Sequence, residues 1–340
     1  MSTFLSDNTA GAHPRIARAV MDTNEGHARP YGDDAESARL DRAFSELFER
    51  EVAVIPCTSG TAANALALSL ILDPTEAVCL HAGSHVYGDE CNAPEFFSGG
   101  ARLHPVDGAE GKLAPEDIRP ALTRRGDRHA AQPAALSIAQ PTETGAVYSL
   151  DELQALGRFA REESLAFHMD GARFGNAVAA LGCSPAEATW KAGVDLLSFG
   201  ATKNGCFAAE AVVLFDPALA ARARFRAKRA GQVLSKMRFL STQLLAYVED
   251  GLWLDCAARA NAKAQALADV LEARGATLQQ RPDANILFAH VTAEQARRLE
   301  AEGLAGYEED GLMRFCTSWA TTDAQIEAVG ACLADRGETT

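Results

Sequence analysis

The segment Leu165-Ala-Phe-His-Met-Asp-Gly-Ala-Arg173 decides the fold class of this chain. Its first five residues form a short, mostly apolar run, and Asp170 follows directly. Such a run is typical of a strand buried on both faces of a parallel sheet, and ligands bind beyond the carboxyl ends of such strands. Asp170 could cap the next helix, a role worth about 1 kcal/mol. Because a buried carboxylate is costly without a cationic partner, Asp170 could instead pair with a ligand.

Similar apolar runs lie on both sides of this segment, separated by stretches with the pattern of helices. The other predicted strands are Val52–Pro56, Ala77–Leu80, Ala135–Ala139, Val194–Phe199 and Ala211–Phe215. The predicted helices include Thr61–Leu72 and Leu150–Glu163, the second opened by Ser149 and Glu152 at capping-box spacing. This alternation predicts a doubly wound, mostly parallel α/β sheet with helices on both faces.

The pattern changes from about Pro217 onward. Long Ala- and Arg-rich helices come first, and short strands then alternate with helices. We expect strands near Ala276–Gln280, Asn285–Val291 and Leu312–Cys316, and helices at Ala293–Glu302 and Thr322–Asp335. The chain is therefore predicted to have a large α/β domain over residues 1–250 and a small α+β domain over residues 251–340.

Composition excludes several classes of partner. The chain has 340 residues and a net charge of −14, whereas binding to nucleic acid needs a basic surface. No apolar stretch reaches the ~20 residues that cross a membrane, and the first residues lack the pattern of a signal peptide. The eight cysteines include no CxxC pair, which is typical of reduced thiols. We expect a cytoplasmic protein that binds neither membranes nor nucleic acid.

Two further segments place reactive groups at the same predicted sheet edge. Lys203 lies in the Gly-rich loop Ser198–Gly205 and is one of only six lysines. It could be an exposed loop residue, or an amine that forms an imine with a carbonyl. The turn Pro56–Thr61 precedes a helix, so it could be a plain turn or could present free N–H groups to an anion.

Taken together, these groups match the requirements of pyridoxal 5'-phosphate. The helix start would bind the phosphate, Asp170 would hold the pyridine nitrogen protonated, and Lys203 would carry the aldehyde. A catalytic metal is not expected, because His81 and His85 lack a carboxylate at ligand spacing. A nucleotide-binding dehydrogenase is disfavoured because no GxGxxG opens a first βαβ unit.

With these residues assembled, the chain resembles the bacterial low-specificity L-threonine and phenylserine aldolases, which have the aspartate-aminotransferase fold. The resemblance runs nearly end to end and is most specific in the combination of Lys203 with His168-Met-Asp-Gly-Ala-Arg173. The other matching segments are Ser6-Asp7, Arg29–Asp34, Thr58–Thr61, Ser84–Phe97, Lys228–Gly231, Asn285-Ile286 and Arg314–Thr317.

The resemblance implies a fold-type-I enzyme with a seven-stranded sheet and a smaller C-terminal domain. It implies retro-aldol cleavage of L-threonine, L-allo-threonine or L-phenylserine-like substrates to glycine and an aldehyde, a carbon–carbon lyase reaction. It also implies a homodimer or homotetramer with active sites at the subunit interface. Another lyase that carries out β-elimination, a racemase, and a non-catalytic module of the same fold remain as alternatives, because fold does not fix reaction.

The resemblance also assigns roles to residues. Lys203 would carry the cofactor, Asp170 would face its ring nitrogen, and Arg173 would contact its phenolic oxygen or the substrate carboxylate. The phosphate would be bound by Ser59, Gly60, Thr61 and Arg229, the last from the same or from a neighbouring subunit. His85 would stack on the ring near the substrate hydroxyl. The substrate would be held by Ser6 and Arg314 at its carboxylate, with Tyr31 lining the pocket.

One position departs from the family pattern. Many of these aldolases carry a second histidine in the segment Gln140–Gly145, where this chain has Glu143. Glu143 could transfer a proton, directly or through water, or it could support His85. The catalytic base is therefore open between His85 and a water held by Glu143.

Overall fold

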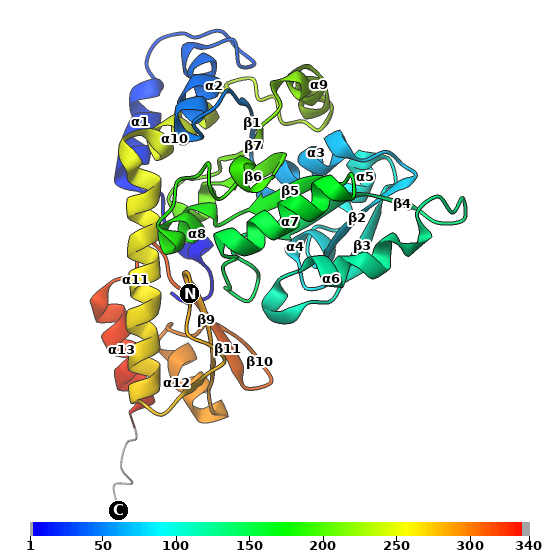
Figure 1. Ribbon diagram of the computed structural model, residues 1–340. Coiled ribbons are helices and arrows are strands. Elements are labelled where there is room, and N and C mark those ends of the chain that lie inside the picture. The colour runs from blue at the N-terminus through cyan, green and yellow to red at the C-terminus, as the bar shows by residue number, and fades with distance from the viewer. Residues whose placement is uncertain (1–2, 335–340) are drawn as a thin grey trace, which may run out of the picture.

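Residues 3–334 are described by the structure, a computed structural model, and a seven-stranded sheet forms its centre (Figure 1). The strand order is β1-β7-β6-β5-β4-β2-β3. The strands are β1 (Ala53–Cys57), β2 (Glu76–His81), β3 (Arg102–Val106), β4 (Gln132–Ala139), β5 (Ala166–Gly171), β6 (Leu196–Gly200) and β7 (Glu210–Leu214). The prediction of a large, mostly parallel sheet is confirmed.

Two strands differ from the prediction. β7 runs antiparallel to both β1 and β6. Only a short loop joins Gly200 to Glu210, whereas a parallel crossover needs about a dozen residues or more. β3 was not predicted, because its exposed Arg102 and the polar and proline residues after it break the apolar pattern. Proline is tolerated there because β3 lies at the edge of the sheet.

Helices cover both faces of this sheet, as the sequence predicts. Leu196 packs in one hydrophobic cluster with Leu66 of α3, whereas its neighbour Leu197 packs in another with Leu156 of α7. Alternate side chains of a strand point to opposite faces, so the two clusters mark the two faces. The helices of this part are α1 (Pro14–Thr23), α2 (Ala35–Leu47), α3 (Gly60–Ile71), α4 (His85–Gly88), α5 (Ala93–Ser98), α6 (Pro115–Ile118), α7 (Leu150–Glu162), α8 (Phe174–Leu181), α9 (Ala220–Arg229) and α10 (Arg238–Val248).

A second, antiparallel sheet with strand order β10-β11-β9-β8 lies in the C-terminal part. Its strands are β8 (Thr277–Leu278), β9 (Ile286–His290), β10 (Tyr307–Glu309) and β11 (Leu312–Cys316), and α12 (Ala293–Ala301) and α13 (Asp323–Leu333) are its helices. The strand β10 was not predicted, because all three of its residues are exposed and polar or amphipathic. The end of the predicted last helix, Asp335, lies outside the described residues.

The helix α11 (Leu252–Ala273) runs alongside both parts of the molecule (Figure 1). Trp253 near its start packs in the core of the large sheet, whereas Leu267 and Leu271 near its end pack on the small sheet. Phe4, from the other end of the chain, joins this second cluster. The division of the chain at residue 250 stays a prediction, and it falls just before this shared helix.

Candidate functional site

A cavity lies beyond the ends of three adjacent strands of the large sheet. Ala139, Asp170 and Lys203 follow or end β4, β5 and β6, which lie side by side. The residues that line the cavity are Gly60, Asn64, His85, Glu90, Ala139, Pro141, Glu143, Asp170, Ala172, Arg173 and Lys203. The predicted edge of the sheet is thus where these polar groups converge.

Asp170 is buried at the end of β5, with 5% of its surface exposed. Its Oδ1 accepts a hydrogen bond from the backbone N–H of Ala172 at 3.0 Å, and its Oδ2 accepts one from Asn64 Nδ2 at 2.9 Å. Within residues 3–334, no lysine or arginine lies within ion-pair distance of Asp170. Because a buried carboxylate is costly with neutral partners alone, this one suits a cationic ligand atom.

The start of α3 supplies a place for an anion. Ser59 caps this helix, and its Oγ accepts a hydrogen bond from the N–H of Ala62. A Cβ added at Gly60 would meet no atom within 4 Å, so the backbone is open on this side. Unpaired N–H groups at a helix start attract phosphate. Thr58, just before the cap, is fixed by hydrogen bonds from its N–H and its hydroxyl to Gln232.

His85 is half-buried at the cavity and is held from two sides. Its Nδ1 lies 3.0 Å from Glu90 Oε1, and its backbone N–H donates to Glu143 Oε1 at 3.1 Å. The hydrogen bond to Glu90 raises the pKa of His85, burial opposes this effect, and the charges of Glu90, Asp170 and Glu143 add to it. With Nδ1 donating to Glu90, the imidazole leaves Nε2 as the nitrogen that can accept a proton.

A single side-chain amide joins this histidine to the buried aspartate. Asn64 Nδ2 donates to Glu90 Oε1 at 2.8 Å and to Asp170 Oδ2 at 2.9 Å. Neither Asn64 nor Glu90 was predicted as a site residue. Asn64 did leave a signal, because it is a polar residue within the apolar run of α3. The remaining oxygens, Asn64 Oδ1 and Glu90 Oε2, are buried without a protein partner among the described atoms.

Lys203 and Arg173 complete the wall of the cavity. Lys203 lies in the short helix η5 (Thr202–Asn204) and is half-buried, so it is not the fully exposed loop residue of the first alternative. The loop that carries Lys203 is fixed by Glu210 at the start of β7, whose Oε2 accepts a hydrogen bond from the N–H of Ala201 at 3.0 Å. Burial raises the pKa of Glu210 to about 7, against the attraction of Lys203 and several hydrogen bonds. Arg173 forms a buried ion pair with Asp7.

Six predicted site residues are not among those that line this cavity. Ser59 and Thr61 flank Gly60 at the start of α3, and the other four lie elsewhere. Ser6 immediately precedes Asp7, and Arg314 Nη2 approaches the carbonyl oxygen of Leu5 at 3.4 Å. These two residues therefore lie near the N-terminal segment that contacts Arg173. By contrast, Tyr31 and Arg229 are exposed and line two separate hollows of the surface.

The polar groups of the cavity fit the chemistry of pyridoxal phosphate. The helix start offers N–H groups for a phosphate, Asp170 offers a buried carboxylate for a protonated ring nitrogen, and Lys203 offers an amine for the aldehyde. The predicted residues Gly60, His85, Glu143, Asp170, Arg173 and Lys203 lie together, whereas their individual roles stay predictions.

Comparisons with known proteins agree with this description. The model of the beta-eliminating lyase family matches residues 3–294. A low specificity L-threonine aldolase from a Pseudomonas species is 43% identical, over 96% of this chain and 96% of that protein. A solved threonine aldolase from Leishmania major superposes with a TM-score of 0.90 at 29% identity, covering 98% of this chain and all of that one. Aspartate aminotransferase from Thermus thermophilus shares the fold, with a TM-score of 0.70 at 18% identity over 98% of this chain and 90% of its own.

Proposed function

Because the chain belongs to the beta-eliminating lyase family and, within it, to the low-specificity L-threonine aldolases, we propose that it cleaves L-threonine and related β-hydroxy-α-amino acids to glycine and an aldehyde. The reaction is that of a carbon–carbon lyase. The observation that carries the proposal is the convergence of Lys203, Asp170 and His85 on one cavity. In the cleavage the hydroxyl loses a proton and Cα gains one, so no other reactant is consumed.

The cofactor of this family is pyridoxal phosphate, and the residues present suit it. When bound, this group supplies an aldehyde that links to amines and a protonated ring that accepts the electron pair of the broken bond. Lys203 would provide the amine and Asp170 the partner of the ring nitrogen. The phosphate would be held by the start of α3, with Ser59, Gly60 and Thr61.

His85 is our proposed base for the hydroxyl proton. Glu90 orients its ring and makes it more basic, and Nε2 is left for the substrate. A base with a pKa close to the working pH suits proton transfer better than an unshifted carboxylate. The oxygen of Glu143 accepts from the backbone of His85, which favours a supporting role for Glu143 over direct proton transfer.

The substrate carboxylate is proposed to bind near the N-terminal segment. Ser6 lies there, and Arg314 reaches the adjacent carbonyl, which supports their predicted role as the carboxylate clamp. Such a clamp would orient the Cα–Cβ bond for cleavage. Arg229 and Tyr31 lie away from the cavity of their own chain, so we propose that they complete the site of a neighbouring subunit in a homodimer or homotetramer. L-phenylserine is a proposed substrate as well, and the cytoplasm is the proposed location.

Among residues 3–334, no helix is both long enough and apolar enough to cross a membrane. The predicted absence of membrane and nucleic-acid partners stays a prediction that fits the acidic charge of the chain.

The test is an absorption spectrum of the purified protein followed by addition of L-threonine or L-phenylserine. We expect a visible absorption band that borohydride abolishes, because reduction of the imine leaves the cofactor covalently attached to Lys203. Addition of substrate should release aldehyde and glycine in equal amounts. A band without aldehyde would overturn the aldolase proposal and point to β-elimination or racemisation. Absence of the band after addition of pyridoxal phosphate would overturn the role of Lys203.

A further inference from the structure

A buried carboxylate from the N-terminal segment holds the arginine of the cavity. Asp7 begins the short helix η1 (Asp7–Thr9) and has 3% of its surface exposed. Its Oδ2 accepts from Arg173 Nε at 2.7 Å, and its Oδ1 accepts from Arg173 Nη2 at 2.9 Å. Two parallel hydrogen bonds of this kind fix the plane of a guanidinium group as well as its distance.

This contact leaves Arg173 with few free donors. A guanidinium has one N–H on Nε and two on each terminal nitrogen. Nε donates to Asp7, and Nη2 donates to Asp7 and approaches Cys316 Sγ at 3.8 Å. No described residue pairs with Nη1, and Arg173 lines the cavity. The two N–H groups on Nη1 are therefore the ones that a ligand can reach.

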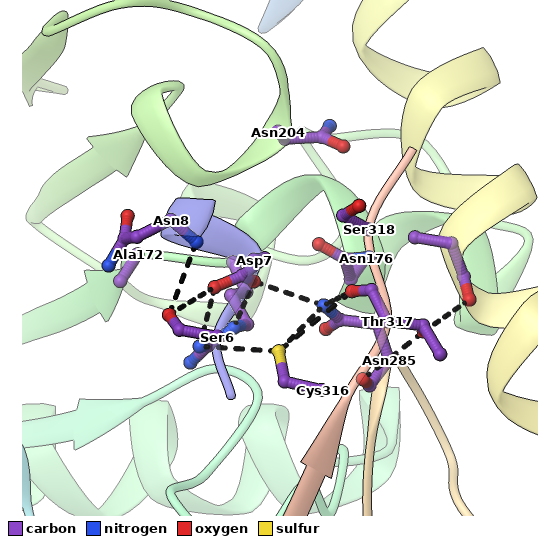
Figure 2. A network of polar contacts seen from close by, with 12 residues as sticks. Ser6, Asp7, Asn8, Ala172, Asn176, Asn204, Asn285, Cys316, Thr317 and Ser318 are labelled. Atoms are coloured by element: carbon purple, nitrogen blue, oxygen red, sulfur yellow. Dashed lines mark hydrogen bonds and ion pairs between the residues drawn. The ribbon is translucent and has the colours of Figure 1, made fainter. Parts of the chain in front are cut away.

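Asp7 is itself held by a second side chain, that of Asn285 (Figure 2). Asn285 Nδ2 donates to Asp7 Oδ2 at 3.0 Å and to the carbonyl oxygen of Thr317 at 2.8 Å. Burial raises the pKa of Asp7, but the charge and hydrogen bonds of Arg173, followed by the charge of Lys203 and the bond from Asn285, outweigh it. The pKa of Asp7 consequently lies below its ordinary value, and the group is ionised at neutral pH.

We propose that Asp7 is a positioning residue of the binding site, which fixes Arg173 so that Nη1 alone is presented to an anionic oxygen of the cofactor or substrate. This inference rests on the proposed function for the identity of the ligand. The N-terminal segment and the small sheet then both belong to the binding machinery. The first carries the carboxylate, and the second holds it through Asn285, just before β9. Without Asp7, Arg173 would keep its charge but lose its fixed orientation.

The test compares Asp7→Asn, Arg173→Gln and the double variant by titration of the apoenzyme with pyridoxal phosphate and by the KM for L-threonine. A hydrogen bond to a charged group is worth about 1.5–3 kcal/mol, or roughly 10- to 100-fold in binding. We expect Asp7→Asn to weaken cofactor binding or raise KM by about this factor, with a much smaller change in kcat. In the Arg173→Gln background the same substitution should add little.

Equal effects of Asp7→Asn in both backgrounds would overturn the inference, since Asp7 would then not act through Arg173. If Asp7→Asn does not fold, Asn285→Ala serves instead, because this change removes one donor to Asp7 and leaves the Asp7–Arg173 ion pair in place. Asn285→Ala should weaken cofactor binding or raise the KM by a smaller factor than Asp7→Asn. Wild-type values for Asn285→Ala would overturn the inference. The control is Asp250→Asn, which breaks the exposed Arg15–Asp250 pair and should change neither quantity. The titration needs no turnover, so a wild-type enzyme that binds cofactor but releases no aldehyde would refute the proposed function alone.

Discussion

The predicted binding residues fall into two groups, which differ in where the fold positions them. Asp170 and Lys203 lie at the ends of neighbouring strands, and His85 opens a short helix just after β2. All three border one cavity. Tyr31, in contrast, is 54% exposed, and Arg229 lies at the exposed end of α9. Lys228 lies over the ring of Tyr31, with its Nζ 4.9 Å from the ring centroid.

The difference teaches that strand order within one chain brings the first group together, and side chains of the same chain then hold it in place. Adjacent parallel strands bring their carboxyl ends together, so we expect these three residues to act together within one chain. The second group needs a further surface, which the proposed oligomer would supply. The predictions below separate these two cases, because the first group should act within a chain and the second between chains.

The largest effect is expected from Lys203→Ala. Loss of the amine should abolish the borohydride-sensitive band and lower kcat by more than about a thousand-fold. Removal of one member of a catalytic unit costs about as much activity as removal of the whole unit. The spectrum and the initial rate of aldehyde release measure this. Lys191→Ala is the matched control, because it removes a surface lysine that pairs with Glu49 and lies over the ring of Trp190, away from the cavity. A Lys203→Ala enzyme with full activity would contradict the assignment.

The next effect concerns the pair of His85 and Glu90. His85→Ala should lose about 10²- to 10⁴-fold in rate while it retains cofactor. In Glu90→Gln the hydrogen bond that raises the pKa of His85 is weakened, so this pKa falls. Because a base acts when unprotonated, activity appears as pH rises through its pKa, and the acid limb of kcat/KM should move to lower pH.

The pH profile of the Glu90→Gln enzyme, measured beside Glu46→Gln, checks this expectation. Glu46 forms an exposed pair with Arg42, so its loss should leave the limb in place. An unmoved acid limb in Glu90→Gln would show that His85 is not the titrating base and would favour a water held by Glu143.

A smaller effect is expected from Arg229→Ala, which should weaken cofactor binding by roughly 10-fold or more if the guanidinium binds phosphate. Arg222→Ala on the same helix is the control and should bind normally. The origin of the arginine is tested by mixing Lys203→Ala with Arg229→Ala at limiting cofactor. In a dimer with shared sites, one site of each hybrid is intact, so about a quarter of wild-type activity should return. No gain on mixing would indicate that each chain uses its own Arg229.

The smallest effect on activity is expected at His168, which lies on β5 two residues before Asp170. It is fully buried between Ser137 and Ser198, and burial lowers its pKa to about 4 although Asp170 opposes the shift. The unfolded chain therefore binds a proton more readily. The contribution of neutral His168 to the free energy of unfolding should be fully present above about pH 6.5. The free energy of unfolding should then fall by about 3 kcal/mol as the pH drops from about 6.5 to 4.

Urea unfolding at several pH values measures this contribution. His168→Asn should remove this pH dependence and leave the KM for L-threonine unchanged. A raised KM would indicate that His168 belongs to the cavity after all.

The site residues that could be predicted are those that a local sequence pattern marks. Asp170 and Lys203 could be predicted because each follows an apolar strand, and the capping box of Ser149 and Glu152 formed as expected. Asp7 could not be paired with Arg173 from the sequence, because their contact depends on how distant segments pack. Glu90 was missed for the same reason, since it lies between α4 and α5 and its partner Asn64 lies on α3, 26 positions earlier in the chain.

The contacts of Asp7 have a consequence for the order of folding. Its partners Arg173 and Asn285 lie 166 and 278 positions further along the chain. Contacts over such separations form late, because the closure entropy of the intervening chain is lost before they stabilise anything. During synthesis the large sheet can assemble first, as domains tend to do. A nascent chain that ends before Asn285 thus carries Lys203 and Asp170 but lacks the residue that fixes the carboxylate beside Arg173, and maturation of the binding site is coupled to completion of translation.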